Sequence, residues 1–580
     1  MRVLCSLLVM ILALALCGCA VAPSGGVTQE PQATVTVEPT MTAPPPTMTA
    51  TPRPSATPEP TLTPTASLEA LKLSLPEGIS LEGVAVGSAL ESLDLASAGY
   101  ALEFVPASEA NLTLSLRDGT EAIPPDAQLF GWRYYAAVVP FDTVDDLGSM
   151  ADVYERWTKA APGALLVDSD TAQVLEALWG PGQPRVVASE ELAQALEEDR
   201  TALGVVPFEA LDPTLKVLSI GARSLFDAAL QPADYPLALA LILEGPGAQS
   251  VGSLLADAVR GWENRDPSRM TSLVMTGVTA MSRLTARQME TYGYEYPALV
   301  IGEELSQADI THVSNEVPFI DGCPVDTSED NLTFCSDYEY WAALEAIGTD
   351  IVGLSGNHVN DFGYDGARES ISFYRERGIP IYGSGMNVSE ACAPMFYEHN
   401  GNRLAFVGAL AYEPSWAWAT DELPGACHYY DHKEALLQRV SELSADPEVD
   451  MVLVELQYLE TYQPYPTDQQ VAEFRELRAA GADVVTGVQS HVPQAWEPYG
   501  EDDDNGSGII VYGLGNLFFD QMWSWETRTA LMARHTIYQG RLINSQVLTT
   551  VLEDYAQPRW AGADERAEIL GRIFGAAPAR

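Results

Sequence analysis

An amide, an imidazole and a carboxylate stand close together in this chain, at Asn357, His358 and Asp361. Such side chains can bind a metal or a phosphate, or exchange a proton with a ligand. Residues 348–353 are typical of a buried strand, and residues 367–378 follow a helical pattern that ends at a glycine. The three side chains should therefore lie on a loop at the carboxyl end of a strand, where open α/β sheets bind ligands. The alternative is a turn in which Asn and Asp side chains only hydrogen-bond the local backbone.

The beginning of the chain predicts export and a lipid anchor. A short positive region precedes an apolar run, residues 3–16, which is too short to span a membrane as a mature helix. The run leads into Leu-Cys-Gly-Cys, which resembles the cleavage box of bacterial lipoproteins, with Cys19 as the lipidated residue. Residues 1–19 are therefore predicted to be a lipoprotein signal peptide. Lipid on Cys19 would anchor the protein to the outer face of the cytoplasmic membrane or an equivalent extracytoplasmic surface.

Residues 20–66 are rich in Pro and Thr and offer almost no apolar surface to bury. Such a composition predicts an extended, disordered segment. We expect it to act as a semi-rigid tether between the lipid anchor and the folded part of the chain.

Four cysteines follow Cys19, and none of them has the Cys-x-x-Cys spacing of a zinc or redox site. In an exported protein one or two disulfides are expected. The simplest pairing joins Cys323 with Cys335 and Cys392 with Cys427. Three pairings are compatible with the sequence, and free buried thiols are the alternative.

The composition excludes some partners without naming a function. A net charge of −50 argues against nucleic acid or an anionic bilayer surface as a partner, because both would be repelled. With 47% hydrophobic residues, the long chain after the tether can bury two or more cores. After the signal peptide, no apolar run reaches the roughly 18 residues that a membrane-spanning helix needs.

Residues 67–245 alternate short apolar strands with helical patterns, which predicts an α/β domain. The strand 134–140, the Trp-containing helix 171–179 and the strand 202–208 follow one another in an order similar to the periplasmic solute-binding fold. No convincing set of ligand contacts accompanies this pattern, so a degenerate or spacing domain is the alternative. Residues 246–270 are predicted to form a connecting helix.

Residues 271–548 carry five motif blocks in a fixed order. They include residues 314–316, which match an Asn-x-Glu block through Asn315 or Ser314, and Glu316. They also include the Asn-His-x-x-Asp-x-Gly pattern from Asn357 and a Leu-Gly-Asn strand end at Asn516. The blocks cover residues 276–283, 308–318, 355–363, 381–391 and 512–520. Together they resemble the CapA family, named for capsule and poly-γ-glutamate synthesis proteins. The resemblance implies a calcineurin-like metallophosphatase fold, an α/β sandwich preceded here by the smaller α/β domain and followed by a tail over residues 549–580.

The chain departs from the family's metal-binding pattern at three positions. The family's Gly-Asp at the end of the first strand is replaced by Gly277 and Val278, and two family histidines are replaced by Gln457 and Gln489. The site residues that remain are Glu316, Asn357, His358 and His491, with Asp361 close by.

The resemblance implies a cation held by Glu316 and His491, with amide support from Gln457 and Gln489. Amide oxygens are neutral ligands that suit calcium or magnesium better than zinc or iron. Two-metal phosphatases need anionic and imidazole ligands around cations roughly 3.5–4 Å apart, so an ordinary binuclear centre is not expected. The site is therefore expected to hold either one divalent ion of unknown identity or no metal ion.

The resemblance also implies a role in the synthesis or handling of a capsule or another exopolymer. In that role the protein would be a phosphoesterase-like hydrolase, in which Asn357 places the substrate and His358, beside Asp361, gives or takes the proton. Its partners would be the exopolymer or the synthesis machinery. The alternative is a non-catalytic surface protein that binds a polymer or an anion. A transporter-associated receptor is a third possibility, and it requires a cleft within residues 67–245.

Overall fold

The computed structural model describes residues 69–75, 99–119, 121–246, 248, 263–328, 330–500 and 507–579. The predicted signal peptide, Cys19 and the predicted tether lie outside the described residues, as does most of the predicted connecting helix. Within the described ranges, no helix is both long enough and apolar enough to cross a membrane.

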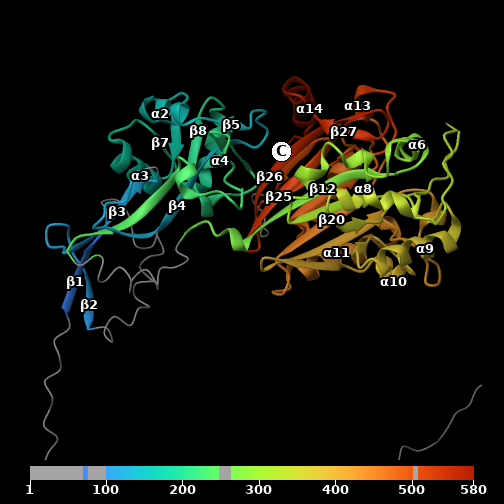
Figure 1. Ribbon diagram of the computed structural model, residues 1–580, viewed down its shortest axis with the longest axis horizontal. Helices are drawn as coiled ribbons and strands as arrows, with labels where there is room; N and C mark the ends of the chain where they lie inside the picture. The colour runs from blue at the N-terminus through green and yellow to red at the C-terminus, as the bar shows by residue number, and fades with distance from the viewer. Residues whose placement is uncertain are drawn as a thin grey trace, which may run out of the picture. The chain divides into compact units, whose positions relative to one another are not determined.

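The first described region is built on one mixed sheet of nine strands (Figure 1). Its order is β2-β1-β3-β11-β4-β8-β6-β7, with β9 paired to β4. The strands are β1 (Glu69–Ser74), β2 (Tyr100–Phe104), β3 (Leu112–Asp118), β4 (Gln128–Pro140), β6 (Leu165–Val167), β7 (Arg185–Val186), β8 (Leu203–Pro207), β9 (Leu215–Val217) and β11 (Ala238–Glu244). A separate short pair consists of β5 (Leu147–Gly148) and β10 (Ser219–Ile220). The helices are α2 (Met150–Thr158), α3 (Ser169–Trp179) and α4 (Leu192–Glu198).

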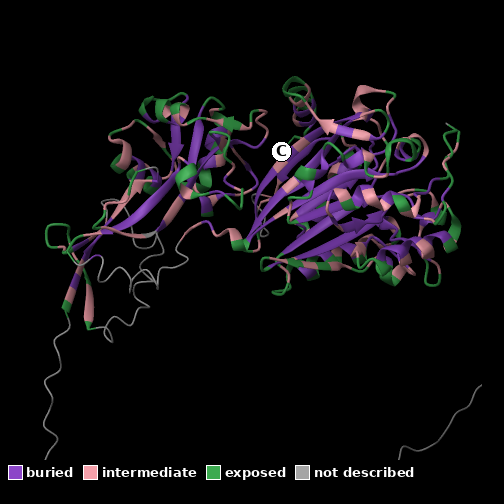
Figure 2. Cartoon of the chain, viewed as in Figure 1, coloured by how far each residue is buried: buried purple, intermediate pink, exposed green. Residues whose placement is uncertain are grey.

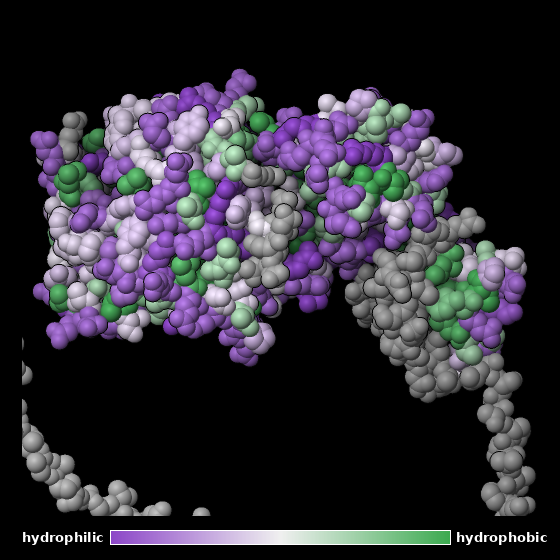
Figure 3. All heavy atoms as spheres, turned by 180° about the vertical axis from the view of Figure 1, so that it is seen from behind, coloured by the Kyte–Doolittle hydropathy of each residue, from purple (hydrophilic) through white to green (hydrophobic). Residues whose placement is uncertain are grey.

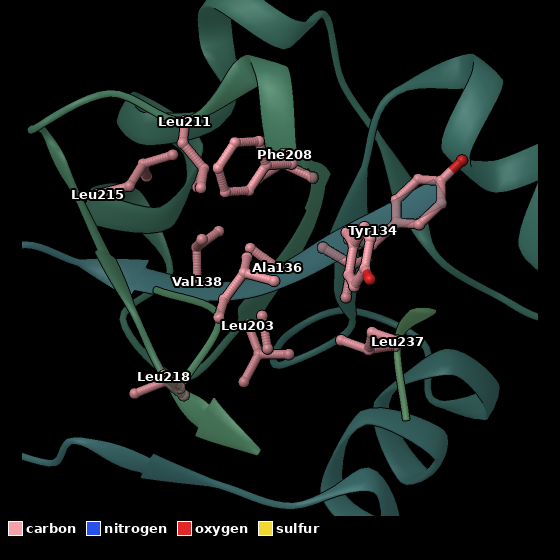
Figure 4. Packing of buried hydrophobic residues seen from close by; sticks show 14 of the residues in the cluster. Tyr134, Ala136, Val138, Leu203, Phe208, Leu211, Leu215, Leu218 and Leu237 are labelled. Atoms are coloured by element: carbon pink, nitrogen blue, oxygen red, sulfur yellow. The ribbon is translucent and has the colours of Figure 1, made fainter. Parts of the chain in front are cut away.

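The core of this region forms around the second half of β4, where residues 134–139 are buried (Figure 4). Ala136 and Val138 on β4 pack with Leu203 at the start of β8 and with Phe208 just after it. Helices α2 and α3 begin at side-chain caps, because Ser149 and Asp168 each accept a hydrogen bond from a backbone N–H of the first turn. The predicted alternation of strands and helices, and with it the α/β class, is confirmed.

Two sheets form the C-terminal sandwich. One has eight strands in the order β15-β14-β13-β12-β25-β26-β27, with β24 paired to β12, and the other has six in the order β17-β18-β20-β21-β23-β22. The first contains β12 (Met270–Thr279), β13 (Ile310–Asn315), β14 (Thr349–Gly353), β15 (Ile381–Tyr382), β24 (Asn516–Phe518), β25 (Thr529–Tyr538), β26 (Arg541–Glu553) and β27 (Gln557–Trp560). The second contains β17 (Met395–His399), β18 (Asn402–Leu410), β20 (Met451–Gln457), β21 (Val484–Val488), β22 (Trp496–Tyr499) and β23 (Gly508–Val511). A small pair consists of β16 (Ser384–Gly385) and β19 (Gly425–Ala426).

Helices cover the outer face of each sheet. The helices of this part are α6 (Arg283–Tyr292), α7 (Gly302–Leu305), α8 (Trp341–Ala346), α9 (Gly363–Glu376), α10 (Val388–Ala391), α11 (Tyr429–Ser444), α12 (Asp468–Ala479), α13 (Trp525–Arg528) and α14 (Ala563–Gly575). Residues of α6, α8 and α9 share a core with the eight-stranded sheet, and residues of α11 and α12 share one with the six-stranded sheet. A third core lies between the sheets, and most strands are accordingly buried, whereas the edge strands β17 and β27 are largely half-buried or exposed (Figure 2). The predicted α/β sandwich is confirmed.

Residues 549–580, predicted as a tail, hold the end of β26, all of β27 and α14 instead. Ile569, Leu570 and Ile573 of α14 are buried in the core between the sheets. Their helical spacing gives α14 an apolar face that must be covered, which a solvated tail would not do. This segment is part of the sandwich.

Both predicted disulfides are confirmed, Cys323 with Cys335 and Cys392 with Cys427. The first closes the segment that carries Phe334, a residue packed beside the candidate site. On the face shown in Figure 3, hydrophilic residues predominate, and hydrophobic ones are scattered apart from one group at the lower right of the view.

Candidate functional site

The side chains that face the space between the two sheets change from apolar to polar toward the carboxyl ends of the strands. Along β20, Met451 and Leu453 belong to the core between the sheets, whereas Glu455 and Gln457 continue the same two-residue alternation as polar side chains. Along β13 the corresponding row is Ile310, His312 and Ser314, and Glu316 follows directly after the strand. The fold therefore delivers polar groups from both sheets to one edge.

Four of the predicted site residues meet at the amide nitrogen of Gln457. Its Nε2 donates to Glu316 Oε2 at 3.2 Å and to Asn357 Oδ1 at 3.0 Å, and it also donates to Gln489 Oε1. Glu316 and Gln457 are each only 1% exposed and Gln489 is 6% exposed, so the cluster is shielded from solvent. Since the residues come from the ends of β13, β14, β20 and β21, the cluster joins the two sheets.

The loop that follows β14 approaches Glu316 too closely for any side chain at position 356. A Cβ atom on Gly356 would lie 2.3 Å from Glu316 Cα and 2.6 Å from Glu316 O. The backbone N–H of Glu316 is itself fixed by a 3.1 Å hydrogen bond to the carbonyl of Thr279 on β12. The glycine before Asn357 is thus what lets the loop place its amide against the carboxylate.

Replacing Gly356 with alanine should therefore lower the free energy of unfolding by about 1–3 kcal/mol, as overpacked sites usually do. Urea unfolding of the full chain measures this change. Gly571→Ala is the matched control, since a Cβ there meets nothing within 4 Å and alanine favours the helix α14. Equal stability of the two variants would contradict the close approach.

The loop after β21 carries two of the predicted ligands in an unusual backbone conformation. Gln489 has φ +88° and His491 has φ +54°, in the left-handed region that side-chain-bearing residues seldom adopt. Ser490 between them donates to the carbonyl of Val492 at 2.7 Å and stabilises the turn. Such strain is a feature of sites where side chains must be aimed at a ligand.

His358 and Asp361 form a hydrogen-bonded pair beside the Gln457 cluster. His358 Nδ1 donates to Asp361 Oδ2 at 2.7 Å, and the same oxygen accepts from the backbone N–H of Phe334 at 2.8 Å. The ring of Phe334 lies 4.5 Å from the imidazole, centroid to centroid. His358 Nε2 makes no hydrogen bond to any described residue, which leaves this atom for a ligand.

The pKa of His358 is raised above its ordinary value of 6.5. Burial of the ring acts in the opposite direction, but the hydrogen bond to Asp361 and the negative charges of Glu316 and Asp361 outweigh it. The raised pKa extends to higher pH the range in which the ring carries the proton that a donor must give.

His491 lies at the same edge but is bonded away from the cluster. Its Nδ1 donates to Asn516 Oδ1 at 2.8 Å, and its ring stacks on Tyr462 with centroids 5.7 Å apart. No hydrogen bond joins it to Glu316, Gln457 or Gln489 within the described residues. The structure thus brings Glu316, Asn357, Gln457 and Gln489 together but leaves His491 outside their hydrogen-bonded group.

The residues at this edge do not fit a two-metal centre. Across the described residues, no group of three or more His, Cys, Asp or Glu side chains is arranged to hold a metal ion. Val278, where the family has an aspartate, is fully buried in an apolar cluster that includes Val317 and Phe519. A carboxylate is therefore missing on one side of the site, and an amide N–H group points inward on the other.

Arg283 and Asp520 are site neighbours that the sequence analysis did not assign a role. The Arg283 guanidinium pairs with Asp520 and lies 5.0 Å from the ring centroid of Phe334 and 5.1 Å from that of Phe519. Arg283 also has a left-handed backbone, φ +47°. Their positions could have indicated a shared role, because Arg283 is the last residue of the first motif block and Asp520 is the last residue of the final one.

A second polar layer lies beneath the cluster, fully buried between the sheets. Ser314 Oγ donates to Glu455 Oε1 at 3.2 Å, and Tyr382 OH lies 2.7 Å from His312 Nε2. Burial raises the pKa of Glu455 to about 8 and lowers the pKa of His312 to about 3. Both groups are therefore mostly neutral at neutral pH, because burial disfavours their charged forms even though His312 Nε2 lies 3.7 Å from Glu455 Oε2.

The sequence and fold of this chain are similar to those of several known proteins. Residues 272–521 match the sequence model of a family described as "Bacterial capsule synthesis protein PGA_cap". This part of the chain is thus similar to proteins of the CapA family. The resemblance predicted from the motif blocks is confirmed.

Two curated relatives carry the CapA name. "Capsule biosynthesis protein CapA" of Bacillus anthracis is 27% identical over 53% of this chain and 74% of its own length. "PGA biosynthesis protein CapA" of Bacillus subtilis (strain 168) is 28% identical over 33% of this chain, and the match spans about half of that relative, 48%.

Solved structures are similar to different parts of the chain. A 5'-nucleotidase precursor from Thermus thermophilus has a TM-score of 0.31 and 13% identity, over 53% of this chain and 59% of its own. An ABC-type phosphate transport receptor from Vibrio cholerae has a TM-score of 0.27 and 10% identity, over 33% of this chain and 96% of its own. TM-scores this low carry no functional argument.

Proposed function

We propose that this protein acts at the extracytoplasmic surface in the synthesis or handling of a capsule or poly-γ-glutamate-type exopolymer. Similarity of residues 272–521 to proteins of the CapA family supports the exopolymer as substrate or the synthesis machinery as partner. The predicted signal peptide and the Leu-Cys-Gly-Cys box support a lipid anchor on Cys19. The strongly acidic composition supports a partner other than nucleic acid.

One observation carries the chemical side of the proposal. The His358–Asp361 pair stands beside the polar cluster of Glu316, Asn357 and Gln457 at a common edge of two sheets. In the proposed reaction, Asn357 and Glu316 position a polar group of the polymer or its precursor. Water attacks the phosphorus of a phosphoester, and His358 Nε2 gives a proton to the oxygen of the leaving group as its bond to phosphorus breaks. Asp361 holds the ring in place through Nδ1.

A second candidate is a binding protein without catalysis. The observation that favours it is the Gln457 hydrogen-bond network, in which one carboxylate faces neutral amide groups. Such a network is better suited to holding a polar ligand than to stabilising a developing phosphate charge. In that case the same edge would hold the polymer through amide and carboxylate hydrogen bonds.

Cells that lack the gene test the proposal. Disruption should reduce surface exopolymer, and the wild-type gene should restore it. His358→Gln should fail to restore it if proton transfer is required, whereas His432→Gln, in helix α11 outside the site, should succeed. If His358→Gln succeeds and Asn357→Ala fails, the binding candidate is supported. Unchanged exopolymer in the disrupted cells would overturn both candidates.

The proposed anchor is tested in the same cells by Cys19→Ser. This variant should leave the membrane fraction or remain uncleaved, and restoration of the exopolymer should fall because the protein no longer stays at the surface. Retention of a processed Cys19→Ser protein in the membrane fraction would overturn the lipid anchor.

A further inference from the structure

The oxygens of the site already converge on a hydrogen-bond donor. Glu316 Oε2, Asn357 Oδ1 and Gln489 Oε1 all lie within hydrogen-bonding distance of Gln457 Nε2. Turning the Gln457 amide over would place its own oxygen against Glu316 Oε2, and a carboxylate has no hydrogen to donate. The Gln457 amide therefore presents its N–H group, and not its oxygen, to these side chains. It occupies the position at which a cation would otherwise hold the three oxygens together.

The charge at this point is small enough for a neutral donor to satisfy. Among the three acceptors only Glu316 is a carboxylate, and the other two are amide oxygens that carry no net charge. Divalent cations are usually held by several anionic or imidazole groups, because these must compensate for the lost water shell. One buried carboxylate beside an N–H donor has no such excess of negative charge.

The neighbouring positions add neither a carboxylate nor an imidazole to the hydrogen-bonded group of Gln457. Val278 lies in the apolar cluster at the end of β12. His491 and His358 each use Nδ1 for an internal hydrogen bond, to Asn516 and Asp361 respectively. Among the described side chains, those that accept from Gln457 Nε2 therefore form a hydrogen-bonded group with a single carboxylate and no imidazole.

We infer that the carboxamide of Gln457 takes the place of a divalent cation, so that the site of this chain is assembled and binds its ligand without a metal. The amide holds Glu316, Asn357 and Gln489 in position, as a bound ion would in a metal centre. This inference concerns the composition of the site and does not depend on the exopolymer being the ligand.

Metal content and thermal unfolding of the purified full chain test the inference. After exposure to Mn²⁺, Zn²⁺, Ca²⁺ or Mg²⁺ and removal of excess ion, the wild type should retain far less than one ion per chain. Its Tm should be the same in EDTA and in each ion, since an ion that binds only the folded state would raise Tm. One retained ion per chain with a Tm that falls in EDTA would overturn the inference.

The isosteric variant Gln457→Glu provides the sharper test. It replaces the N–H donor with an oxygen, so four oxygens with two negative charges then face one another. Its Tm in EDTA should fall by several degrees and recover when Ca²⁺ or Mn²⁺ is added. Gln494→Glu is the matched control: Gln494 is also buried, and its Nε2 donates to Thr461 Oγ1 and Gln463 O rather than to carboxylates.

The control should lose stability without recovery in either ion. Equal responses of the two variants to metal would overturn the assignment of the cation position to Gln457. If Gln457→Glu does not fold, the wild-type metal content and EDTA response decide by themselves. None of these readouts involves exopolymer, so a failure here is distinguishable from a failure of the proposed function.

Discussion

Replacing Asp361 with asparagine should lower the pKa of His358 to or below 6.5 and abolish the acid–base role of the site. Asparagine has the same shape but removes the negative charge and the charged hydrogen bond that keep the imidazolium form stable. The burial of the ring, which favours the neutral form, would then act unopposed by its nearest partner. A pH titration of the His358 ring signals by NMR measures the change.

The His358–Asp361 pair also makes the free energy of unfolding depend on pH. Because the pKa of His358 is raised in the folded state, the pair contributes stability that is fully present below pH 6.5. This stability is lost as the pH rises through the folded-state pKa. Asp361→Asn should remove that pH dependence, and with it most of the restored exopolymer in the complementation experiment.

Asp365→Asn is the control for this prediction. Asp365 lies four residues further on, at the start of α9, and its fully exposed side chain pairs with Arg368. It should leave the His358 titration unchanged. A His358 pKa that stays raised in Asp361→Asn would show that the pair is not what sets it.

Glu455→Gln should make the protein more stable above neutral pH than the wild type. The carboxyl has an ordinary pKa of 4.5 and one of about 8 when buried between the sheets. The folded state therefore binds a proton that the unfolded state has released between these values. Stability should fall by about 1.4 kcal/mol for each pH unit gained across that window. Glutamine keeps an oxygen for Ser314 and does not titrate, so the fall should disappear.

Two buried histidines give the free energy of unfolding a pH dependence opposite to that of Glu455, and they do so at lower pH. Burial lowers the pKa of His312 and of His535 to about 3 each, so protonation favours the unfolded state. Stability should be lost as the pH falls from 6.5 through 3. Between 4.5 and 6.5 the contributions of Glu455 and His312 oppose one another.

Urea unfolding at several pH values separates these contributions. Glu455→Gln should flatten the alkaline side of the stability curve and leave the acid side steep. Glu448→Gln, at an exposed position, should leave both sides as in the wild type. An alkaline fall that persists in Glu455→Gln would show that another group is responsible.

Much of the architecture could be predicted because it depends on local patterns. The alternation of apolar strands and helices marked the α/β class, and the glycine after the run 367–377 marked the approximate end of α9. The loop from Asn357 to Asp361 follows a buried strand, as its neighbours in the sequence require. The pairing of Cys323 with Cys335 was the simplest choice because these residues are close in the chain.

The tail over residues 549–580 was predicted wrongly for a related reason. Ile569, Leu570 and Ile573 have helical spacing, but a short apolar face can be assigned to a core only when the position of that core is known. The second polar layer was missed although a signal was present. Glu455 precedes Gln457 by two residues, and Ser314 precedes Glu316 by two, which puts each pair on the same face of its strand.

By itself, the sequence determined which residues could form a site: the family blocks, the retained His358 and the altered positions Val278, Gln457 and Gln489. Only the tertiary structure decided what those alterations do. Gln457 and Glu316 are separated by 141 positions and come from different sheets, so no local pattern reveals their hydrogen bond. The sandwich brings the strand ends together, and there the Gln457 amide faces the oxygens of Glu316 and its neighbours.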